Sequence, residues 1–364
     1  MNRNFGNTKN LYLSKLNKIC STIVKNNFSY ALWSLPGKRK VQKLFGKSSL
    51  ISIDKIQDNS FIICPFENSE KVFAIENNNS IDENISIDEN LNNIHISKSN
   101  NQGISKNEYL TLVENGIQEI RKGGFQKLVL SRNYLHSISE KFNPLDFFYN
   151  IQNKYIDAFT YLISVPELGT WIGASPELFL KRNKKHTETV ALAGTKTKDE
   201  IQKNILFSEK EKKEQEIVSE YIRDVLKELN INFVEHKAEI IKAAELCHLQ
   251  SRFVTQNNDF NLSKLIINLH PTPAVCGTPK KEAFKYIVQK EGYKRELYSG
   301  FIGPYFNKYS FEYFVNLRCM QVHKSKAIFY AGAGILSDSC AEDEYFETQN
   351  KIRTLLSTIE KKNY

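Results

Sequence analysis

The sequence lacks any uninterrupted apolar run as long as a membrane span, which takes about 18 residues or more. None of its six cysteines forms a C-x-x-C pair, which argues against a zinc ribbon or a thioredoxin-type redox site. No apolar segment of signal-peptide type follows the basic N-terminal stretch. We therefore expect a cytoplasmic protein with reduced thiols that binds no membrane.

Positive charge is in modest excess and is not concentrated in one part of the sequence. Lysine and arginine number 50 and aspartate and glutamate 41, so the formal net charge is +9. The lysines are spread along the chain and are not interleaved with aromatic residues, as they are in many nucleic-acid-binding surfaces. We expect no nucleic-acid partner and a monomeric chain.

Residues 1–104 are predicted to form a mixed N-terminal part of the fold. The pattern over 7–30 predicts an amphipathic helix, which the proline and glycine in 31–37 would end. The apolar run at 60–66 predicts a strand. Residues 75–103 form an Asn-rich, low-complexity insertion with a near-tandem repeat, and we expect a flexible surface loop without chemistry.

Residues 105–364 carry the candidate functional residues. Helical spacing of apolar residues predicts three helices, at 105–123, 208–229 and 341–360. Apolar runs predict strands at 127–131, 158–165 and 169–182, and a hairpin of 310–322 with 325–336. Because helices and hairpins alternate without a βαβ rhythm, we expect an α+β fold with a mostly antiparallel sheet.

Two residues are candidates for acid–base chemistry. Lys127 begins an apolar strand, where loss of hydration would lower its pKa and make it a base near neutral pH. The alternative is a strand-end lysine that reaches water. Glu177 follows the turn Gly-Ala-Ser-Pro and precedes an apolar strand, where a raised pKa would make it a proton donor. The alternative is an exposed turn glutamate.

Four glutamates on two predicted helices are candidate metal ligands. Glu214 extends the apolar stripe of the helix at 208–229, and Glu211 lies on nearly the same face. Glu344, Glu347 and Lys351 share one face of the last helix. Carboxylates without His or Cys suit Mg²⁺. The alternatives are a surface ion pair on the last helix and, for the mixed-charge run 210–214, a solvated helix face.

Further residues are candidates for anion recognition. The small residues around Gly332 allow backbone N–H groups to approach a ligand, although the third glycine of a dinucleotide-binding motif is absent. Arg318 lies in a predicted strand, where its partner is either a substrate carboxylate or an internal salt bridge. His248 is either a core histidine or a substrate contact. The rigid loop at 270–274 contains two prolines and ends at Ala274.

The order of these motifs, rather than any one of them, resembles the chorismate-utilising enzyme family over roughly residues 105–360, and within it the isochorismate synthases. The motifs are Lys-Leu-Val-Leu-Ser-Arg (127–132), Gly-Ala-Ser-Pro-Glu (173–177), Leu-Ala-Gly-Thr (192–195), Glu214, His-Pro-Thr-Pro-Ala-Val-Cys-Gly (270–277), Arg-Glu-Leu-Tyr-Ser-Gly (295–300), Leu-Arg-Cys (317–319), Ala-Gly-Ala-Gly-Ile (331–335), and Glu344 with Glu347, Thr348 and Lys351.

The resemblance implies a fold, a substrate and a metal. Family members pack two large antiparallel sheets together, with helices outside, and bind chorismate with one Mg²⁺ in a closed cleft. The resemblance makes Lys127 the base that activates water for attack at C2, and Glu177 the acid that protonates the departing C4 hydroxyl. It makes Glu214 and Glu347 the Mg²⁺ ligands, with Glu344 and Glu211 close by through water. Its substrate contacts are Thr195, His248, Ala274, Arg318, Gly332 and Lys351.

Two residues favour water over ammonia as the nucleophile. Relatives that add ammonia usually carry an amide residue in place of Lys127, and the aminodeoxychorismate type carries a lysine in place of Ala193. The closest alternative is a salicylate synthase, which also eliminates pyruvate; a more remote one is a binding protein without catalysis. Gln215 departs from the family pattern, which usually has histidine after the metal-binding glutamate. The product would feed menaquinone or siderophore synthesis.

Overall fold

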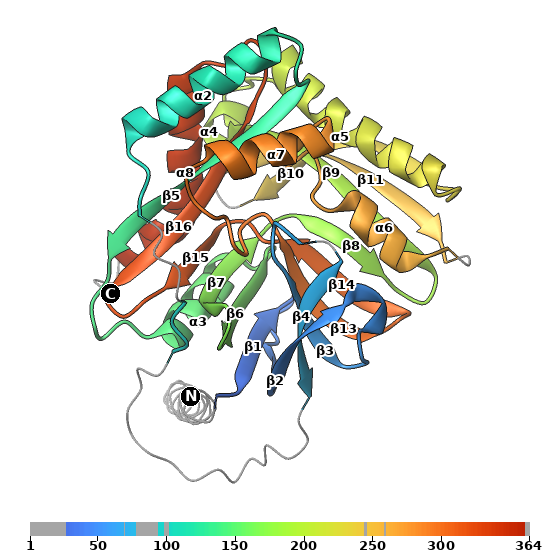
Figure 1. Ribbon diagram of the computed structural model, residues 1–364, viewed down its shortest axis with the longest axis vertical. Coiled ribbons are helices and arrows are strands. Elements are labelled where there is room, and N and C mark those ends of the chain that lie inside the picture. The colour runs from blue at the N-terminus through green and yellow to red at the C-terminus, as the bar shows by residue number, and fades with distance from the viewer. Residues whose placement is uncertain are drawn as a thin grey trace.

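The computed structural model describes residues 27–68, 70–77, 94–97, 102–243, 246–257 and 260–360 (Figure 1). Most of the predicted helix at 7–30 and the repeat within 75–103 lie outside these residues. Among the residues described, no helix combines the length and the apolar composition that crossing a bilayer requires.

One antiparallel sheet organises the molecule. Its strands are hydrogen-bonded in the order β10-β11-β9-β8-β14-β13-β3-β4-β2-β1-β6-β7-β15-β16-β5-β12. The bounds of these 16 strands are β1 Ser29–Ser34, β2 Gln42–Ser52, β3 Ser60–Cys64, β4 Lys71–Asn77, β5 Lys127–Ser137, β6 Phe159–Val165, β7 Gly169–Ser175, β8 Leu178–Arg182, β9 His186–Thr197, β10 Val234–Ala243, β11 Leu246–Gln256, β12 Gly277–Thr278, β13 Phe301–Asn307, β14 Ser310–Val315, β15 Cys319–Val322 and β16 Lys326–Ile335.

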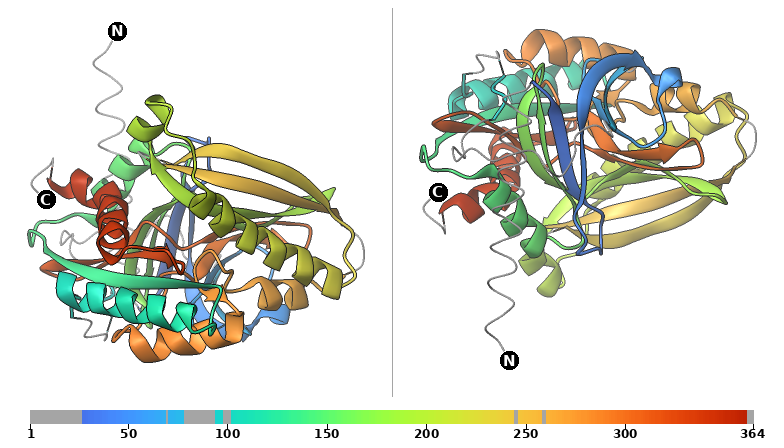
Figure 2. Two further views of the ribbon diagram at one scale, coloured as in Figure 1. Left: turned by 90° about the horizontal axis from the view of Figure 1, so that it is seen from above. Right: turned by 90° about the horizontal axis from the view of Figure 1, so that it is seen from below.

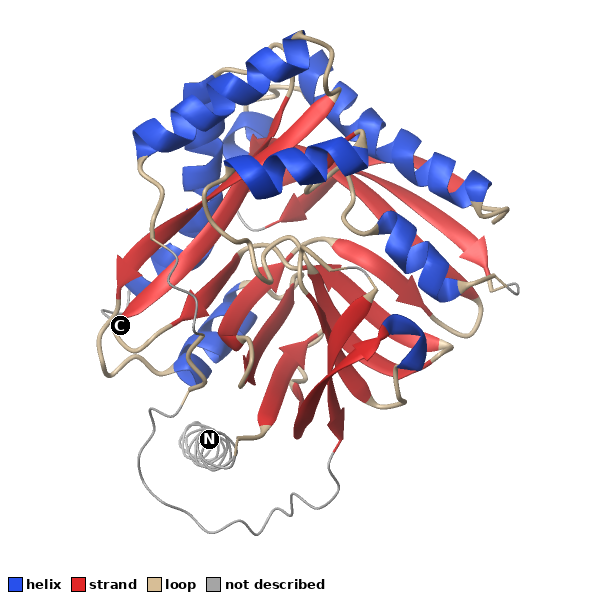
Figure 3. Ribbon diagram, viewed as in Figure 1, coloured by secondary structure: helices blue, strands red, loops and turns tan. Residues whose placement is uncertain are grey.

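Helices cover the outside of this sheet (Figures 2 and 3). Apolar side chains of α5 and α6 pack with strands of one half of the sheet, and those of α3 and α8 with strands of the other half. A further apolar cluster joins α2 and α7 to β5 and β16. Their bounds are η1 Ile53–Lys55, α2 Lys106–Arg121, α3 Pro144–Lys154, α4 Lys198–Gln202, α5 Glu209–Glu228, α6 Leu262–Leu269, α7 Lys280–Lys290 and α8 Ala341–Glu360.

The two halves of the sheet face one another across an aromatic core. Phe159 of β6 stacks on Phe314 of β14 with their ring centroids 4.3 Å apart, although these strands are not neighbours in the sheet. Trp33 of β1 meets Phe61 of β3 in the same cluster. The expected α+β architecture, with antiparallel layers packed together and helices outside, is therefore confirmed, and hydrogen bonds join the layers into one ladder.

The three long predicted helices are confirmed as α2, α5 and α8. The start of α2 is fixed by a capping box, in which Ser105 accepts from the Glu108 backbone N–H and the Glu108 carboxylate accepts from Ser105 in return. At the start of α5 the Ser208 backbone N–H donates to the Glu211 carboxylate. The strand predicted at 60–66 is confirmed as β3.

Three predictions of local structure are wrong in part. Residues 29–34 form strand β1, buried throughout, rather than the end of a helix. The sequence did not reveal this strand, because a strand covered on both faces lacks the alternation of polar and apolar residues. Strand β4 continues to Asn77, into the segment predicted to be a loop. The predicted strand 169–182 is two strands, since β7 pairs with β6 whereas β8 pairs with β9 and β14.

The predicted strand 310–322 is also two strands, with Arg318 between them. Arg318 has a φ of 47°, a left-handed conformation that a strand does not accommodate. As a result β14 pairs with β13, and only β15 forms the hairpin with β16. Arg318 therefore lies between two strands, and its carbonyl oxygen accepts from the backbone N–H of Ala174 in β7 at 3.0 Å.

Candidate active site

A cleft lies where α5 and α8 meet the ends of β5, β7, β9 and β16. Its volume is about 600 Å³, with the open mouth included. Of the residues predicted to act on a substrate or metal, the lining includes Glu177, Thr195, Glu214, His248, Ala274, Arg318, Gly332 and Lys351. Segments that are distant in the sequence are therefore brought together as expected.

Lys127 is fully buried behind the cleft wall. Its ammonium nitrogen lies 3.0 Å from Oε1 of Glu214, with an orientation outside hydrogen-bond geometry. Lys127 itself does not line the cavity, whereas its neighbours Glu214 and Gly334 do. The alternative of a lysine that reaches water is wrong, since its side chain has 0% exposure.

Glu177 is 3% exposed and is not the exposed turn residue of the alternative interpretation. Burial raises the pKa of Glu177 to about 8, although the positive charges of Lys127, Lys351 and Arg318 act in the opposite direction. The raised pKa predicted from the sequence is confirmed. Glu177 is therefore largely protonated at neutral pH and can donate a proton.

Two glycines allow the backbone of β16 to approach these side chains. A Cβ on Gly334 would overlap Oε1 of Glu214 and would lie 3.2 Å from Cε of Lys127. A Cβ on Gly332 would lie 3.0 Å from the hydroxyl of Tyr298. We call Glu177, Gly332 and Gly334, which line the cleft, together with Lys127, which is buried next to Gly334, the sheet floor.

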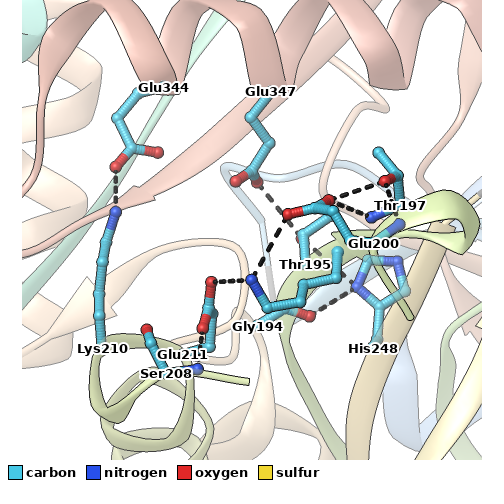
Figure 4. Close-up of polar contacts among 11 residues, drawn as sticks. Gly194, Thr195, Thr197, Glu200, Ser208, Lys210, Glu211, His248, Glu344 and Glu347 are labelled. Atoms are coloured by element: carbon cyan, nitrogen blue, oxygen red, sulfur yellow. Dashed lines mark hydrogen bonds and ion pairs between the residues drawn. The ribbon is translucent and has the colours of Figure 1, made fainter. Parts of the chain in front are cut away.

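We call the four predicted carboxylates the helical rim: Glu211 and Glu214 on α5, and Glu344 and Glu347 on α8. Of these four, Glu214 lines the cleft. Each of them pairs with a lysine, and Figure 4 shows Lys210 reaching from the start of α5 to Glu344. The distances are 3.0 Å for Lys127–Glu214, 3.3 Å for Lys196–Glu211, 2.6 Å for Lys210–Glu344 and 2.6 Å for Lys351–Glu347.

The predicted surface ion pair on α8 does form between Lys351 and Glu347, but its lysine lines the cleft. The prediction that the run 210–214 is a solvated helix face is wrong for Lys210 and Glu214, which contact other elements of the site. These two side chains point toward ion-pair partners on β5 and α8, and the alternation of positive and negative residues in the run does not predict this.

The carboxylates of the rim have the chemistry of a site for a hard divalent cation. Burial and then the negative charge of Glu347 raise the pKa of Glu344 to about 7, so these two groups repel one another. Against burial, the charge of Lys351 lowers the pKa of Glu347. In the part of the chain described, no three such groups are arranged around one point as metal ligands. A carboxylate-only donor set suits a hard divalent cation, and here each carboxylate is paired with a lysine.

His248 is a neutral residue of the cleft wall. Burial and the charges of Arg318 and Lys351 lower the pKa of His248 to about 3. Its Nδ1 lies 2.9 Å from the carbonyl oxygen of Gly194, which can only accept, so we assign the proton to Nδ1. Its Nε2 then accepts from Arg318 at 3.5 Å. Figure 4 shows His248 beside Gly194 and Thr195.

Arg318 remains available to an anion. Within the described part of the chain no carboxylate lies within ion-pair distance of it, so the alternative of an internal salt bridge finds no support there. Lys351 lies nearby on the same wall and donates to the Gly332 carbonyl at 2.8 Å. Thr195 bridges His248 and Glu347, at 3.4 Å from each.

The rigid loop contributes Ala274 to the lining but does not contribute His270. His270 packs between Phe179 and Phe301 with its Nε2 3.2 Å from the Pro65 carbonyl oxygen. The departure at Gln215 is also explained. Its amide nitrogen donates to Ser219 and Ser251, and it fastens α5 to β11 instead of reaching the cleft.

Sequence reasoning missed two tyrosines and two lysines. Tyr298 and Tyr330 line the cleft and stack with their centroids 5.7 Å apart, which provides a flat apolar wall. Tyr298 belongs to a quoted motif, so a signal was present. Lys196 and Lys210 gave no signal, because their carboxylate partners lie on other elements.

Comparison with known proteins identifies the family. Residues 56–360 match the family described as chorismate binding enzyme. The chain therefore belongs to the chorismate-binding enzyme family. The match begins well before residue 105 and so extends to β3 and β4 of the N-terminal part.

Individual relatives agree with this. Over 278 residues the chain is 32% identical to isochorismate synthase 2, chloroplastic, from Arabidopsis thaliana, covering 72% of this chain and 49% of the relative. It is 30% identical over 211 residues to isochorismate synthase EntC from Escherichia coli K12, covering 56% and 54%. The chain thus spans about half the length of these two relatives.

A solved structure has the same fold. The menaquinone-specific isochorismate synthase MenF from Escherichia coli superposes with a TM-score of 0.75 at 20% identity, covering 91% of this chain and 88% of that structure. At this level of identity the likeness concerns the fold. The chemistry is therefore argued from the residues of the cleft.

Proposed function

We propose that this chain converts chorismate into isochorismate by adding water at C2 of the ring and expelling the C4 hydroxyl. The observation that carries the proposal is the combination, at one cleft, of buried Lys127 and buried Glu177 with a pKa raised to about 8. A reaction that needs a base on one side of a ring and an acid on the other suits this pair.

The proposed step balances without a redox partner. Lys127 accepts a proton from water as the new C2–O bond forms. The ring double bonds shift, and the C4–O bond breaks while Glu177 gives its proton to the departing oxygen. One water enters and one leaves, so the reaction is an isomerisation, and a proton returned from Lys127 to Glu177 restores the site.

Cationic and aromatic groups of the cleft suit the substrate, which is a dianion. Arg318 and Lys351 are placed to receive carboxylates, with Thr195 and the neutral His248 beside them. The stacked Tyr298 and Tyr330 suit the flat face of the ring. The small residues Ala193 and Gly332 leave room in the wall.

We further propose Mg²⁺ as the cofactor. Glu214 and Glu347 would hold it, with Glu344 and Glu211 close by through water, and the carboxylate-only donor set supports this choice. Mg²⁺ bound there would neutralise a substrate carboxylate and orient the ring. Binding would exchange lysine partners for the cation, so cation affinity is expected to depend on the ion pairs of the rim.

Chromatography of products tests the proposal. Purified protein is incubated with chorismate and Mg²⁺, with and without ammonia. Isochorismate formed without pyruvate is the expected result. Salicylate with pyruvate would transfer the chain to the salicylate synthases, and an ammonia-dependent aromatic amine would contradict water as the nucleophile. Absence of turnover, with chorismate still bound, would leave a binding protein.

A further inference from the structure

A second cavity adjoins the cleft on the far side of Arg318. Its volume is about 1010 Å³ with its open mouth included, and it shares two lining residues, Arg318 and Pro176, with the cleft. The end of β10 and the segment after α3 supply much of the rest. The two cavities therefore adjoin at Pro176 and at Arg318, the residue proposed to receive a substrate carboxylate.

Two more relations connect this cavity to the cleft. Ile241 of β10 lines the cavity and pairs in register with His248 of β11, which lines the cleft. Thr354 lines the cavity one turn beyond Lys351 on α8, so it continues the helix face that carries Lys351 and Glu347. The cavity is thus an extension of the cleft along α8 and β10.

The charge of the cavity suits an anion. Its lining includes Lys154, Lys198 and Lys242 in addition to Arg318, against one acidic lining residue, Asp157. Lys154 donates to Ser357 and Thr358. Lys242 lies exposed at the end of β10. A passage lined by one sign of charge raises the local concentration of a ligand of the opposite sign.

We propose that this second cavity is the entry vestibule of the cleft, through which a small dianion carrying two carboxylates is drawn by the lysines toward Arg318. The inference rests on the proposed function, since it takes chorismate as the dianion. Lys242 then acts on the rate of substrate capture and not on the chemical step.

Binding kinetics test the vestibule directly. Chorismate is mixed with a Lys127→Gln chain, which holds substrate without turnover, and intrinsic tyrosine and tryptophan fluorescence is followed by stopped flow. Ile241→Trp, placed in this background, fills the cavity. It is expected to lower the association and dissociation rates by the same factor, about tenfold or more, with an unchanged dissociation constant, because a blocked passage slows both directions. Ala158→Trp, at another lining residue of the cavity, repeats the test should Ile241→Trp fold poorly.

Charge reversal gives the second arm. Lys242→Glu is expected to lower the association rate about 3- to 10-fold at low salt, and to approach the parent rate in about 0.5 M salt. Lys237→Glu on the same strand makes the same change in net charge away from the cavity, and should stay within about twofold of the parent rate.

Unchanged rates in both tryptophan variants would overturn the vestibule, as would equal effects of Lys242→Glu and Lys237→Glu. A Lys127→Gln chain that does not bind chorismate, together with an unaltered chain that does not turn it over, would overturn the proposed function and the vestibule with it.

Discussion

The sheet floor and the helical rim of the cleft handle charge in opposite ways. On the floor, Glu177 is buried without an ion-pair partner in the described structure, and burial raises its pKa to about 8. On the rim, each of the four carboxylates has a lysine within 3.3 Å. The carboxyl proposed to donate a proton is thus isolated from ion-pair partners, whereas each carboxylate proposed to attract a cation is paired with a lysine. Mutations on the two sides can therefore be compared, with Lys127 common to both because it pairs with Glu214 of the rim.

The largest expected effect is at Lys127. Lys127→Gln removes the proposed base and should reduce turnover of chorismate by about 10³- to 10⁴-fold, the upper part of the range for general base catalysis. Lys210→Gln is the matched variant on the rim, since Lys210 also pairs with a glutamate. Its turnover at saturating Mg²⁺ should fall less than about tenfold. Equal losses in steady-state kinetics would erase the distinction between floor and rim.

Glu177→Gln should reduce turnover by about 10²- to 10³-fold, because an amide cannot give up a proton at this site. In the parent, turnover is expected to fall as the pH rises through about 8, since only the protonated carboxyl donates. The residual activity of Glu177→Gln should lack this alkaline limb. If turnover of both the parent and Glu177→Gln falls at alkaline pH in the same way, the fall arises from a group other than Glu177.

Loss of a carboxylate of the helical rim should weaken binding of the proposed cation. Glu347→Gln is expected to weaken Mg²⁺ binding about 10- to 100-fold, at least the cost seen for groups that only support metal ligands. Isothermal titration calorimetry measures this without turnover. The control is Glu342→Gln on the same helix, an exposed residue paired with Lys106. Unaltered affinity in Glu347→Gln would remove that residue from the cation site.

Gly334→Ala tests the close approach of the sheet floor to the helical rim. The added Cβ would displace the Glu214 carboxylate and crowd Lys127, so turnover should fall about tenfold, and overpacking should cost about 1–3 kcal/mol of stability. Gly124→Ala is the control, because its Cβ would meet one backbone oxygen, at 3.2 Å, and Gly124 does not line the cleft. Kinetics and thermal unfolding of both variants give the comparison. Full activity in Gly334→Ala would mean that the close approach has no catalytic role.

The smallest expected effect is on stability. Between pH 4.5 and about 8 the unfolded chain ionises Glu177 while the folded chain keeps it protonated, so unfolding releases a proton and stability falls as the pH rises. Glu177→Gln lacks this penalty. Its melting temperature should exceed that of the parent by a few degrees at pH 9, and the difference should vanish near pH 4.5. Parallel melting curves at all pH values would contradict the raised pKa.

The sequence predicted the parts that depend on local pattern. Helices α2, α5 and α8 show apolar spacing and, in α2 and α5, capping residues, and the chemical candidates lie in short motifs next to turns. Strand β1 could not be identified as a strand, because burial on both faces removes the alternation that marks one. The break at Arg318 depends on a left-handed backbone conformation that the neighbouring residues do not predict.

The sequence indicated which residues are candidates for the site, but not which ion pairs they form. Lys127 and Glu177 were both open to a solvent-exposed interpretation, and only the packing of distant elements shows that they are buried. The lysine partners of the rim are tertiary: Lys210 meets Glu344 across 134 positions of the chain. Such pairs leave no pattern in a single sequence.

Labelled water tests the central claim most directly. The chain is incubated with chorismate and Mg²⁺ in water enriched in ¹⁸O, and the isochorismate formed is analysed by mass spectrometry. Attack of water at C2 with loss of the C4 hydroxyl predicts one ¹⁸O atom per molecule, located at C2. Isochorismate without the label would show that the original hydroxyl migrates within the substrate, and would contradict the roles given to Lys127 and Glu177.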